Sequence, residues 1–230
     1  GLPVIATGHQ PVFYYPGILL KNFLADKLAS KTGGVALNFV VDTDSGALEI
    51  PVPCKQNHQL CKSMASLKTD ETTVHAGFQP TEEELKHFFD ETERQLDTLN
   101  KQGERIRSAF RNYRHGFMQT FRSGKSFTET LTKVRSEFEK ANQMDIRNYS
   151  LSELCKTTAY HSFLLFIIQH IDTYRKHFNQ AIEDQTNKEY QPVKKLSLTK
   201  TCYELPFWLI KDNQRYPVFA QQDTQSITLH

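Results

Sequence analysis

The opening of the chain decides the fold, because residues 2–42 read LPVIATGHQPVFYYPGILLKNFLADKLASKTGGVALNFVVD. Leu2 to Thr7 is a short apolar run closed by Gly8, which is typical of a buried strand. Residues 35–42 form a second run of this kind. A strand–helix–strand order over so short a stretch predicts a βαβ unit, whose right-handed crossover makes the two strands parallel. We therefore expect an α/β fold built on a parallel sheet.

The helix of this unit is predicted from an apolar stripe that begins after Gly17 and stops before Gly33-Gly34, a common helix end. The stripe consists of Ile18, Leu19, Leu20, Phe23, Leu24 and Leu28. Lys21, Asp26 and Lys27 fall on the other side of the helix. We expect the stripe to face the sheet and the charged residues to face solvent.

Later segments also predict sheet and helix. Residues 48–52 predict a further strand, and 203–210 with 215–220 predict a hairpin that turns at 211–214. Pro206 and Pro217 favour edge positions in that hairpin. The region from Leu151 to about Tyr190 is rich in apolar residues at helical spacing and is expected to pack against the sheet.

Between these strands lies a long helical segment whose seam residues follow one another in steps of four and three, a period of about 3.5 residues that is typical of coiled coils. The seam consists of Leu85, Phe89, Thr92, Leu96, Leu99, Gly103, Ile106, Phe110, Tyr113 and Phe117. A second run covers residues 127–141, after an expected turn at 123–126. We therefore predict a long antiparallel helical coiled-coil hairpin at 79–149, inserted into an α/β core formed by 1–78 with 150–230.

Local signals support the two helical arms. Each arm is preceded by a capping box, in which side chains satisfy free N–H groups of the first turn: Thr81 with Glu84, and Ser126 with Glu129. Acidic residues gather early in the first arm and basic residues late, which complements a helix dipole. The same gradient could instead present a basic tip at 105–125 to RNA, although charged rows on such helices are usually solvated faces.

The composition favours small molecules or other proteins as partners. The net charge is +2 and the mean hydropathy is −0.54. The densest apolar run, 163–168, is far shorter than the roughly 20 residues that cross a bilayer, so no membrane partner is expected. Nearly balanced charge gives no reason to expect nucleic acid. Four cysteines without a Cys-x-x-Cys pair, and no signal-peptide pattern in residues 1–7, favour a cytoplasmic protein.

The candidate binding site follows the first strand, at Thr7-Gly8-His9-Gln10-Pro11. Ligands of open parallel sheets bind outside the carboxyl ends of the strands. Gly8 allows close backbone approach, while His9 and Gln10 supply hydrogen-bond donors. The helix start at Gly17 would aim free N–H groups at an anion, and Lys21 would add a positive charge. The alternative is a turn in which His9 and Gln10 only secure the loop.

A second polar group follows the second strand, where Asp42 and Asp44 put two carboxylates beside the same crevice. They could hold a ribose, a magnesium ion or an amine. Asp-Thr-Asp-Ser-Gly is equally ordinary turn chemistry. Of the two ideas, neither is favoured by the residues alone.

Two further motifs are weaker. The sequence around Gly124-Lys125-Ser126 is not a phosphate-binding P-loop, since Gln119 occupies the position of the first glycine and a helix precedes it. Soft metal ligands occur at Cys54, His58, Cys61 and His75, but their spacing is not that of a zinc site. We expect these cysteines and histidines to be structural and assign no metal ligands.

The residues described above resemble the amino-terminal core of the bacillithiol synthase family, the cysteine-adding enzymes. The resemblance rests on Thr7 to Pro11, the Gly17-led helix with Lys21, and the strand that ends in Asp42-Thr43-Asp44. It is specific over about residues 4–45, while His9 stands where the family has glutamine. The family inserts a long coiled coil into a Rossmann-like, HUP-type core shared with class I aminoacyl-tRNA synthetases. The chain would be a separate bacterial branch of that family or an amino-terminal fragment.

The resemblance implies a nucleotide-binding, ligase-like protein. ATP or a similar nucleotide, with or without magnesium, would bind Thr7, Gly8, His9, Gln10, Gly17 and Lys21. His9, Asp42 and Asp44 would be the catalytic residues, and the small-molecule substrate would carry an amine or a thiol. The alternative is a non-catalytic scaffold that assembles as a homodimer through its coiled coil.

Overall fold

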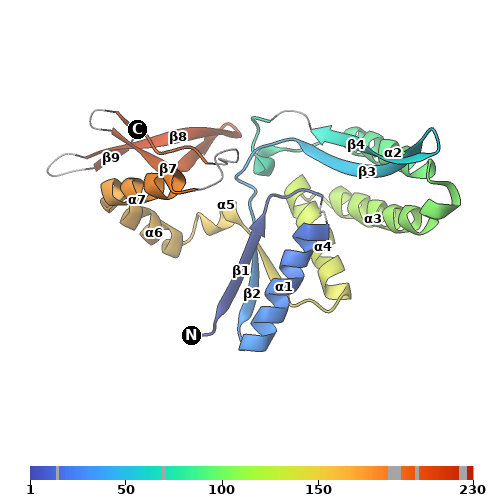
Figure 1. The fold of residues 1–230 in the computed structure, drawn as a ribbon, viewed down its shortest axis with the longest axis horizontal. Coiled ribbons are helices and arrows are strands. Elements are labelled where there is room, and N and C mark those ends of the chain that lie inside the picture. Colours follow the sequence, from blue (N-terminus) through green and yellow to red (C-terminus); the bar gives the residue numbers. More distant parts are fainter. Residues whose placement is uncertain (14–15, 69–70, 186–192, 200–201, 223–226, 230) are drawn as a thin grey trace. The chain divides into compact units, whose positions relative to one another are not determined.

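The computed structural model divides the chain into two compact units, residues 1–153 and 154–230 (Figure 1). The structure describes residues 1–13, 16–68, 71–185, 193–199, 202–222 and 227–229. The fold is mixed α/β, as expected. The two units differ from the predicted domains. Residues 154–230 form a unit of their own, whereas 150–230 were predicted to form one core with 1–78.

A three-stranded parallel sheet organises the first unit. Its strands are β1 (Val4–His9), β2 (Val35–Val40) and β5 (Ile146–Ser150), in the order β1-β2-β5. Helix α1 (Pro16–Thr32) connects β1 to β2, and both strand pairs are parallel, which confirms the predicted βαβ unit. Strand β5 was not predicted, because five residues of mixed polarity directly after a helix carry little periodic signal.

The glycines at the end of α1 bring β2 back beside β1. Gly33 has a left-handed φ of 64°, and the N–H of Gly34 donates to the carbonyl of Ala29 at 2.8 Å, a common helix C-cap arrangement. A Cβ atom at Gly34 would lie 2.4 Å from the carbonyl oxygen of Pro3. Only glycine fits there, so this pair fixes the entry into β2.

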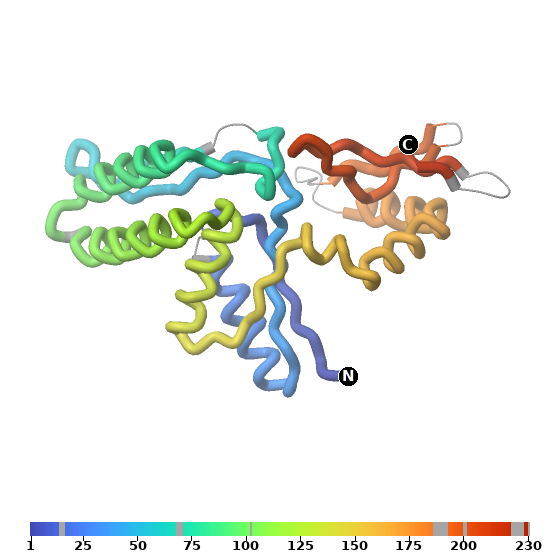
Figure 2. Tube along the Cα trace, turned by 180° about the vertical axis from the view of Figure 1, so that it is seen from behind, coloured from blue at the N-terminus to red at the C-terminus, as the bar shows by residue number. Residues whose placement is uncertain are grey.

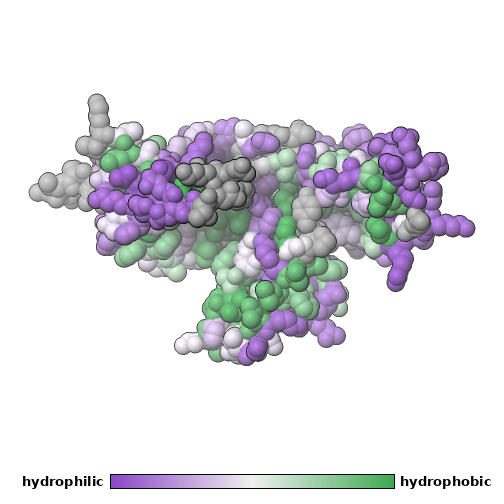
Figure 3. Space-filling view, viewed as in Figure 1, coloured by the Kyte–Doolittle hydropathy of each residue, from purple (hydrophilic) through white to green (hydrophobic). Residues whose placement is uncertain are grey.

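The predicted orientation of α1 is wrong. Four residues of the apolar stripe are exposed, by 41–65%: Leu20, Phe23, Leu24 and Leu28. Hydrophobic side chains accordingly gather on the surface over β1 and α1 (Figure 3). The buried side instead carries Ala25 and Ala29, whose small side chains allow close approach to β2, together with two hydrogen-bonded polar residues, Asn22 and Asp26. Small size and directional bonds therefore outweighed hydrophobicity.

The predicted continuous helical arm is also wrong, because it is broken in the middle. Helix α2 (Glu82–Asp97) is followed by the short 3-10 turn η2 (Asn100–Gly103) and by α3 (Glu104–Arg122), and α4 (Phe127–Ala141) comes after a second turn. A Cβ atom at Gly103 would lie 2.6 Å from the Cβ of Leu99, so glycine permits the tight first turn. Both predicted capping boxes are present.

Helices α2 and α3 lie side by side and run in opposite directions (Figure 2). Ion pairs link the start of α2 to the end of α3, and the end of α2 to the start of α3. They join Glu82 with Arg122, Asp90 with Arg114, Glu93 with Arg111, and Asp97 with Arg107. The acidic-to-basic gradient of the sequence therefore matches two antiparallel helices. It needs neither a helix dipole nor an RNA partner to account for it.

A hairpin of two strands covers these helices. It consists of β3 (Leu48–Gln56) and β4 (Gln59–Lys68), which are antiparallel and form a sheet separate from β1 and β2. Only the first part of β3 was predicted. Asn57 and His58 form the turn with φ values of 49° and 65°, as a two-residue hairpin turn requires.

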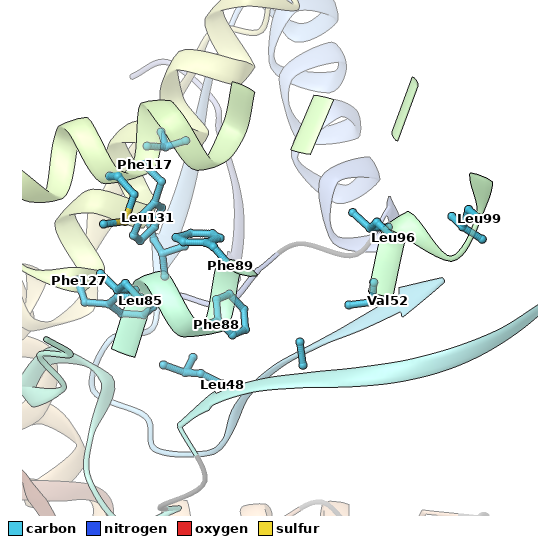
Figure 4. Packing of buried hydrophobic residues seen from close by; sticks show 13 residues of the cluster. Leu48, Val52, Leu85, Phe88, Phe89, Leu96, Leu99, Phe117, Phe127 and Leu131 are labelled. Atoms are coloured by element: carbon cyan, nitrogen blue, oxygen red, sulfur yellow. The ribbon is translucent and has the colours of Figure 1, made fainter. Parts of the chain in front are cut away.

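The main hydrophobic core of the first unit lies between this hairpin and helices α2, α3 and α4 (Figure 4). We call its rings the aromatic cluster, which comprises Phe13, Phe88, Phe89, Phe117 and Phe127. The ring centres of Phe89 and Phe117 lie 5.3 Å apart, and those of Phe117 and Phe127 lie 5.9 Å apart, which is favourable packing for aromatic rings. Most of the predicted seam is thus buried within one chain, whereas its residue Ile106 is 47% exposed.

The second unit combines a four-stranded antiparallel sheet with helices. The sheet has the order β6 (Leu198–Thr199), β7 (Cys202–Lys211), β8 (Gln214–Gln222) and β9 (Ile227–Leu229), and α6 (Thr158–Gln169) and α7 (Ile171–Glu183) contribute to the core formed with it. The predicted hairpin is confirmed. The predicted helical region packs on this sheet instead of the parallel one, and its residues 186–190 lie outside the described residues.

The two prolines occupy inner strands of that sheet, not the predicted edges. Pro206 lies where the pairing of β7 and β8 is irregular, between Glu204 and Trp208. Pro217 lies in β8 beyond the pairing with β9, which starts at Ala220. Pro206 therefore lies where the ladder is interrupted, whereas Pro217 is aligned with Trp208 of β7 and has no partner among the described residues of β9.

Candidate functional site

The carboxyl ends of β1, β2 and β5 meet at one edge of the parallel sheet, since all three strands run in the same direction. His9 ends β1 and is aligned with Val40 at the end of β2, which is aligned with Ser150 at the end of β5. We call this edge the strand-end site. It is the part of an open parallel sheet where ligands usually bind.

His9 is held at this edge as a neutral imidazole. Desolvation by burial lowers its pKa below the ordinary value, and the positive charges of Lys21 and Arg135 lower the pKa further. The carbonyl of Gln10 lies 3.3 Å from Nδ1 and acts in the opposite direction. At neutral pH the ring can therefore donate one hydrogen bond and accept another.

Gln10 and Asp44 connect the loops after β1 and β2. The amide nitrogen of Gln10 donates to a carboxylate oxygen of Asp44 at 2.8 Å, and the other oxygen accepts from the backbone N–H of Ser45 at 3.0 Å. The carbonyl of Asp44 accepts from the N–H of His75 at 2.8 Å. Asp44 therefore orders the two loops, and through them the side chain of Gln10.

Asp42 makes a comparable link to the end of β5. It is 3% exposed, and it accepts from the N–H of Ser152 at 2.9 Å and from the hydroxyl of the same residue. Ser152 lies in the short helix α5 (Leu151–Leu154). The carboxylate thus anchors the segment that follows β5. This is a structural role, as in a turn, but the partner of Asp42 lies far along the chain.

The other predicted nucleotide-binding residues lie in two places, within the strand β1 and on the exposed first turns of α1. Thr7 lies on the face of β1 that is aligned with Asn38 of β2, and Gly8 lies on the opposite face. A Cβ atom at Gly8 would be 3.2 Å from the carbonyl oxygen of Phe39, so this glycine serves close pairing of β1 with β2. Gly17 and Lys21 are exposed on the first turns of α1, and Nζ of Lys21 lies 3.5 Å from the carbonyl of Gly8.

A buried polar network, here called the polar layer, lies between α1, α4 and the sheet. It comprises Asn22, Asn38, Arg135, Glu139 and Asn148. Glu139 is 1% exposed, and its two oxygens accept from Asn22 at 2.9 Å and from Asn148 at 2.8 Å. Arg135 donates to Asn148 at 2.9 Å and lies 3.7 Å from Glu139. Each buried charge is thereby compensated.

Arg135 links this layer to the strand-end site, although its position in the chain did not indicate this role. Its charge acts on His9, as described above, and also on Tyr113 of α3. Arg135 follows Val134 of the predicted seam in a helix that is rich in polar residues, and basic residues in such helices usually face solvent. Ser152 and Asn148 were missed for a related reason, since β5 itself was not predicted.

The suggested metal ligands do not converge. Cys54 and Cys61 are paired across β3 and β4 with their sulfur atoms 3.2 Å apart, and His58 lies in the turn between the strands. Among the residues that the structure describes, no three His, Cys, Asp or Glu side chains form a group that could hold a metal ion. The zinc hypothesis therefore has no ligand set in that part of the chain.

Comparisons with known proteins give no assignment. No family model matches the chain, and no curated protein matches its sequence. Within the described part of the chain, every helix is too short or too polar to cross a membrane.

Proposed function

We propose that the strand-end site binds the phosphate groups of a nucleotide such as ATP, and that the protein is a ligase-like enzyme. The observation that carries the proposal is that the positive charges of Lys21 and Arg135 both act on His9 at the end of β1, where Nζ of Lys21 lies 3.5 Å from the carbonyl of Gly8. Positive charge next to hydrogen-bond donors is the environment that a phosphate group requires.

The surrounding loops support this role. Gln10 is oriented by Asp44, so a donor and acceptor side chain stands beside His9 in a fixed position. Helix α1 begins shortly after, at Pro16, and its N-terminal end carries a partial positive charge. In this proposal the first unit is a Rossmann-like core, and the helices α2 to α4 are its insertion.

The two carboxylates would act mainly by positioning. Asp42 fixes Ser152, and Asp44 fixes Gln10, so each would order a loop around the ligand. A magnesium ion bound with the nucleotide would be held chiefly by phosphate oxygens. The second substrate, a small molecule with an amine or a thiol, follows from the resemblance to the cysteine-adding enzymes.

Nucleotide binding is tested by thermal unfolding with ATP and magnesium. Bound ligand should raise the Tm, because it stabilises the folded state alone. Lys21→Gln should reduce the shift, since the exposed ammonium group would contact phosphate. Lys31→Gln, at the far end of the same helix, is the matched control and should behave like the wild type. The absence of any Tm shift at millimolar ATP would contradict the proposal.

A scaffold that assembles with copies of itself is the second candidate. The predicted coiled-coil seam is occupied inside the chain, because Leu85, Phe89 and Phe117 are fully buried in the core. The exposed stripe of α1 offers another surface for assembly. Such apolar patches often mark interaction sites.

One substitution distinguishes the two candidate functions. Leu24 is 55% exposed on α1, so Leu24→Glu should leave the fold intact. A scaffold that uses this stripe would lose assembly in analytical ultracentrifugation, whereas nucleotide binding at the strand-end site would be unchanged. If the wild type is monomeric at all concentrations, the scaffold candidate fails.

A further inference from the structure

A cavity of about 440 Å³ lies beside the strand-end site in the first unit. Its walls come from the loop after β1, from α1 and β3, and from the helices α3 and α4. This volume lies within the range of about 300–1,000 Å³ that is typical of small-molecule sites. The lining does not include His9, Gln10, Asp42 or Asp44, which were assigned to the nucleotide site above.

Most of the wall is apolar. The residues that supply it include Val12, Leu19, Ile50, Leu131, Val134 and Phe138. Water inside such walls finds few hydrogen-bond partners, so an apolar molecule would displace it favourably. The main body of a ligand should therefore be hydrocarbon or aromatic.

Two polar groups also line the cavity. Among its described lining residues, Arg135 alone carries a charge. The side chain of Arg135 is 9% exposed, and its charge acts on the second group, Tyr113. A buried guanidinium group provides planar, paired donors that suit a carboxylate.

Tyr113 supplies a donor at the same wall. Burial raises the pKa of its hydroxyl, which therefore stays protonated, while the charge of Arg135 acts in the opposite direction. Within the described residues, the Tyr113 hydroxyl has no hydrogen-bond partner. Because Tyr113 lines the cavity, its hydroxyl can donate a hydrogen bond to a ligand oxygen there.

We propose that this cavity binds an apolar carboxylate, with the hydrocarbon or aromatic body against α4 and β3 and the carboxylate between Arg135 and Tyr113. The two sites share Arg135, but the proposal does not depend on nucleotide binding, because the apolar wall and Tyr113 take no part in the phosphate site. It adds a second small-molecule site to the first unit.

Binding is measured with the full chain by isothermal titration calorimetry, using butanoate, hexanoate, octanoate and decanoate as probes. The Kd should fall about fourfold for each added methylene until the cavity is full. Octylamine and octanol should bind more weakly than octanoate. Equal binding of the three octyl compounds would overturn the assignment of a carboxylate, and no binding of any probe would overturn the site.

Two substitutions locate the ligand. Ile50→Trp should abolish octanoate binding by filling the cavity, while Leu60→Trp, which lies 72% exposed on β4, is the matched control and should bind normally. Tyr113→Phe keeps the ring and should weaken octanoate binding about tenfold by removing one hydrogen bond to a charged group. Circular dichroism confirms that each variant is folded. Octanoate binding that survives both Ile50→Trp and Tyr113→Phe would place the ligand elsewhere and overturn the proposal.

Discussion

The two sides of the first unit are stabilised in different ways. Under the β3–β4 hairpin, the aromatic cluster forms a closed apolar core in which Phe89 and Phe117 are fully buried. Between α1, α4 and the parallel sheet, the polar layer fills the interior with amides and charges. There four apolar residues of α1, among them Leu20 and Leu24, are exposed, while Glu139 of α4 is buried.

The two regions therefore have different roles: the aromatic cluster stabilises the first unit, and the polar layer fixes the positions of its side chains. Apolar burial is strong and non-directional, so the aromatic cluster can stabilise the unit without fixing side chains to a fraction of an ångström. A hydrogen-bonded layer adds less net free energy but fixes geometry, because each partner must be satisfied. The polar layer includes Arg135, whose positive charge acts on His9, so the layer is linked electrostatically to the strand-end site.

The largest effect is expected in the aromatic cluster. Phe89→Ala removes a fully buried ring that contacts Phe88, Phe110 and Phe117, and it should lower the free energy of unfolding by about 3–5 kcal/mol. Urea denaturation followed by far-UV circular dichroism measures this change. The fluorescence of Trp208, the sole tryptophan, reports residues 154–230 separately.

The matched control is an apolar residue on the other side of the unit. Leu20 is 65% exposed on α1, so Leu20→Ala should change the free energy of unfolding by about 0.5 kcal/mol or less. Similar losses for Phe89→Ala and Leu20→Ala would show that the exposed stripe is covered in solution. That result would also strengthen the scaffold candidate.

An intermediate effect is expected in the polar layer. Glu139→Gln keeps the shape but replaces one acceptor oxygen with a donor, so Asn22 or Asn148 loses its partner. The cost should be about 1–3 kcal/mol. Glu137→Gln, exposed on the same helix, should have almost no effect. A loss as large as that of Phe89→Ala would mean that the layer is also a main source of stability.

Local signals in the sequence predicted local structure well. The strand–helix–strand unit, both capping boxes and the hairpin around Asp212 depend on residues close together in the chain, and all three are present. The α1 orientation and the break near Gly103 depend on partners far along the chain. Asn22 meets Glu139, and Glu82 meets Arg122, and no spacing rule in one segment reveals such pairs.

The candidate site shows the same limit. Parallel strands bring their carboxyl ends to one edge, so the placement of His9, Asp42 and Asp44 beside one another was predictable from the βαβ pattern. Their partners were not. Ser152 belongs to a segment after an unrecognised strand, and Arg135 comes from a helix that was assigned to a coiled coil.

The smallest effect concerns the charge around His9. The pKa of His9 is lowered from its ordinary value of 6.5 in the folded chain. Below about pH 6.5 the unfolded chain therefore binds the proton more tightly than the folded chain does. The stability that neutral His9 contributes is therefore present above about pH 6.5 and is lost as the pH falls through the folded pKa. His9→Gln should remove this part of the pH dependence in urea denaturation between pH 5 and 8.

Lys21 provides the direct test, because its charge is one cause of the lowered pKa. The NMR titration midpoint of the His9 ring should lie below 6.5 in the wild type and should rise in Lys21→Gln, which removes a neighbouring positive charge. Lys31→Gln should leave it unchanged. A midpoint that does not move in Lys21→Gln would show that the charge of Lys21 does not reach His9. The polar layer, through Arg135, would then be the remaining source of positive charge at the strand-end site.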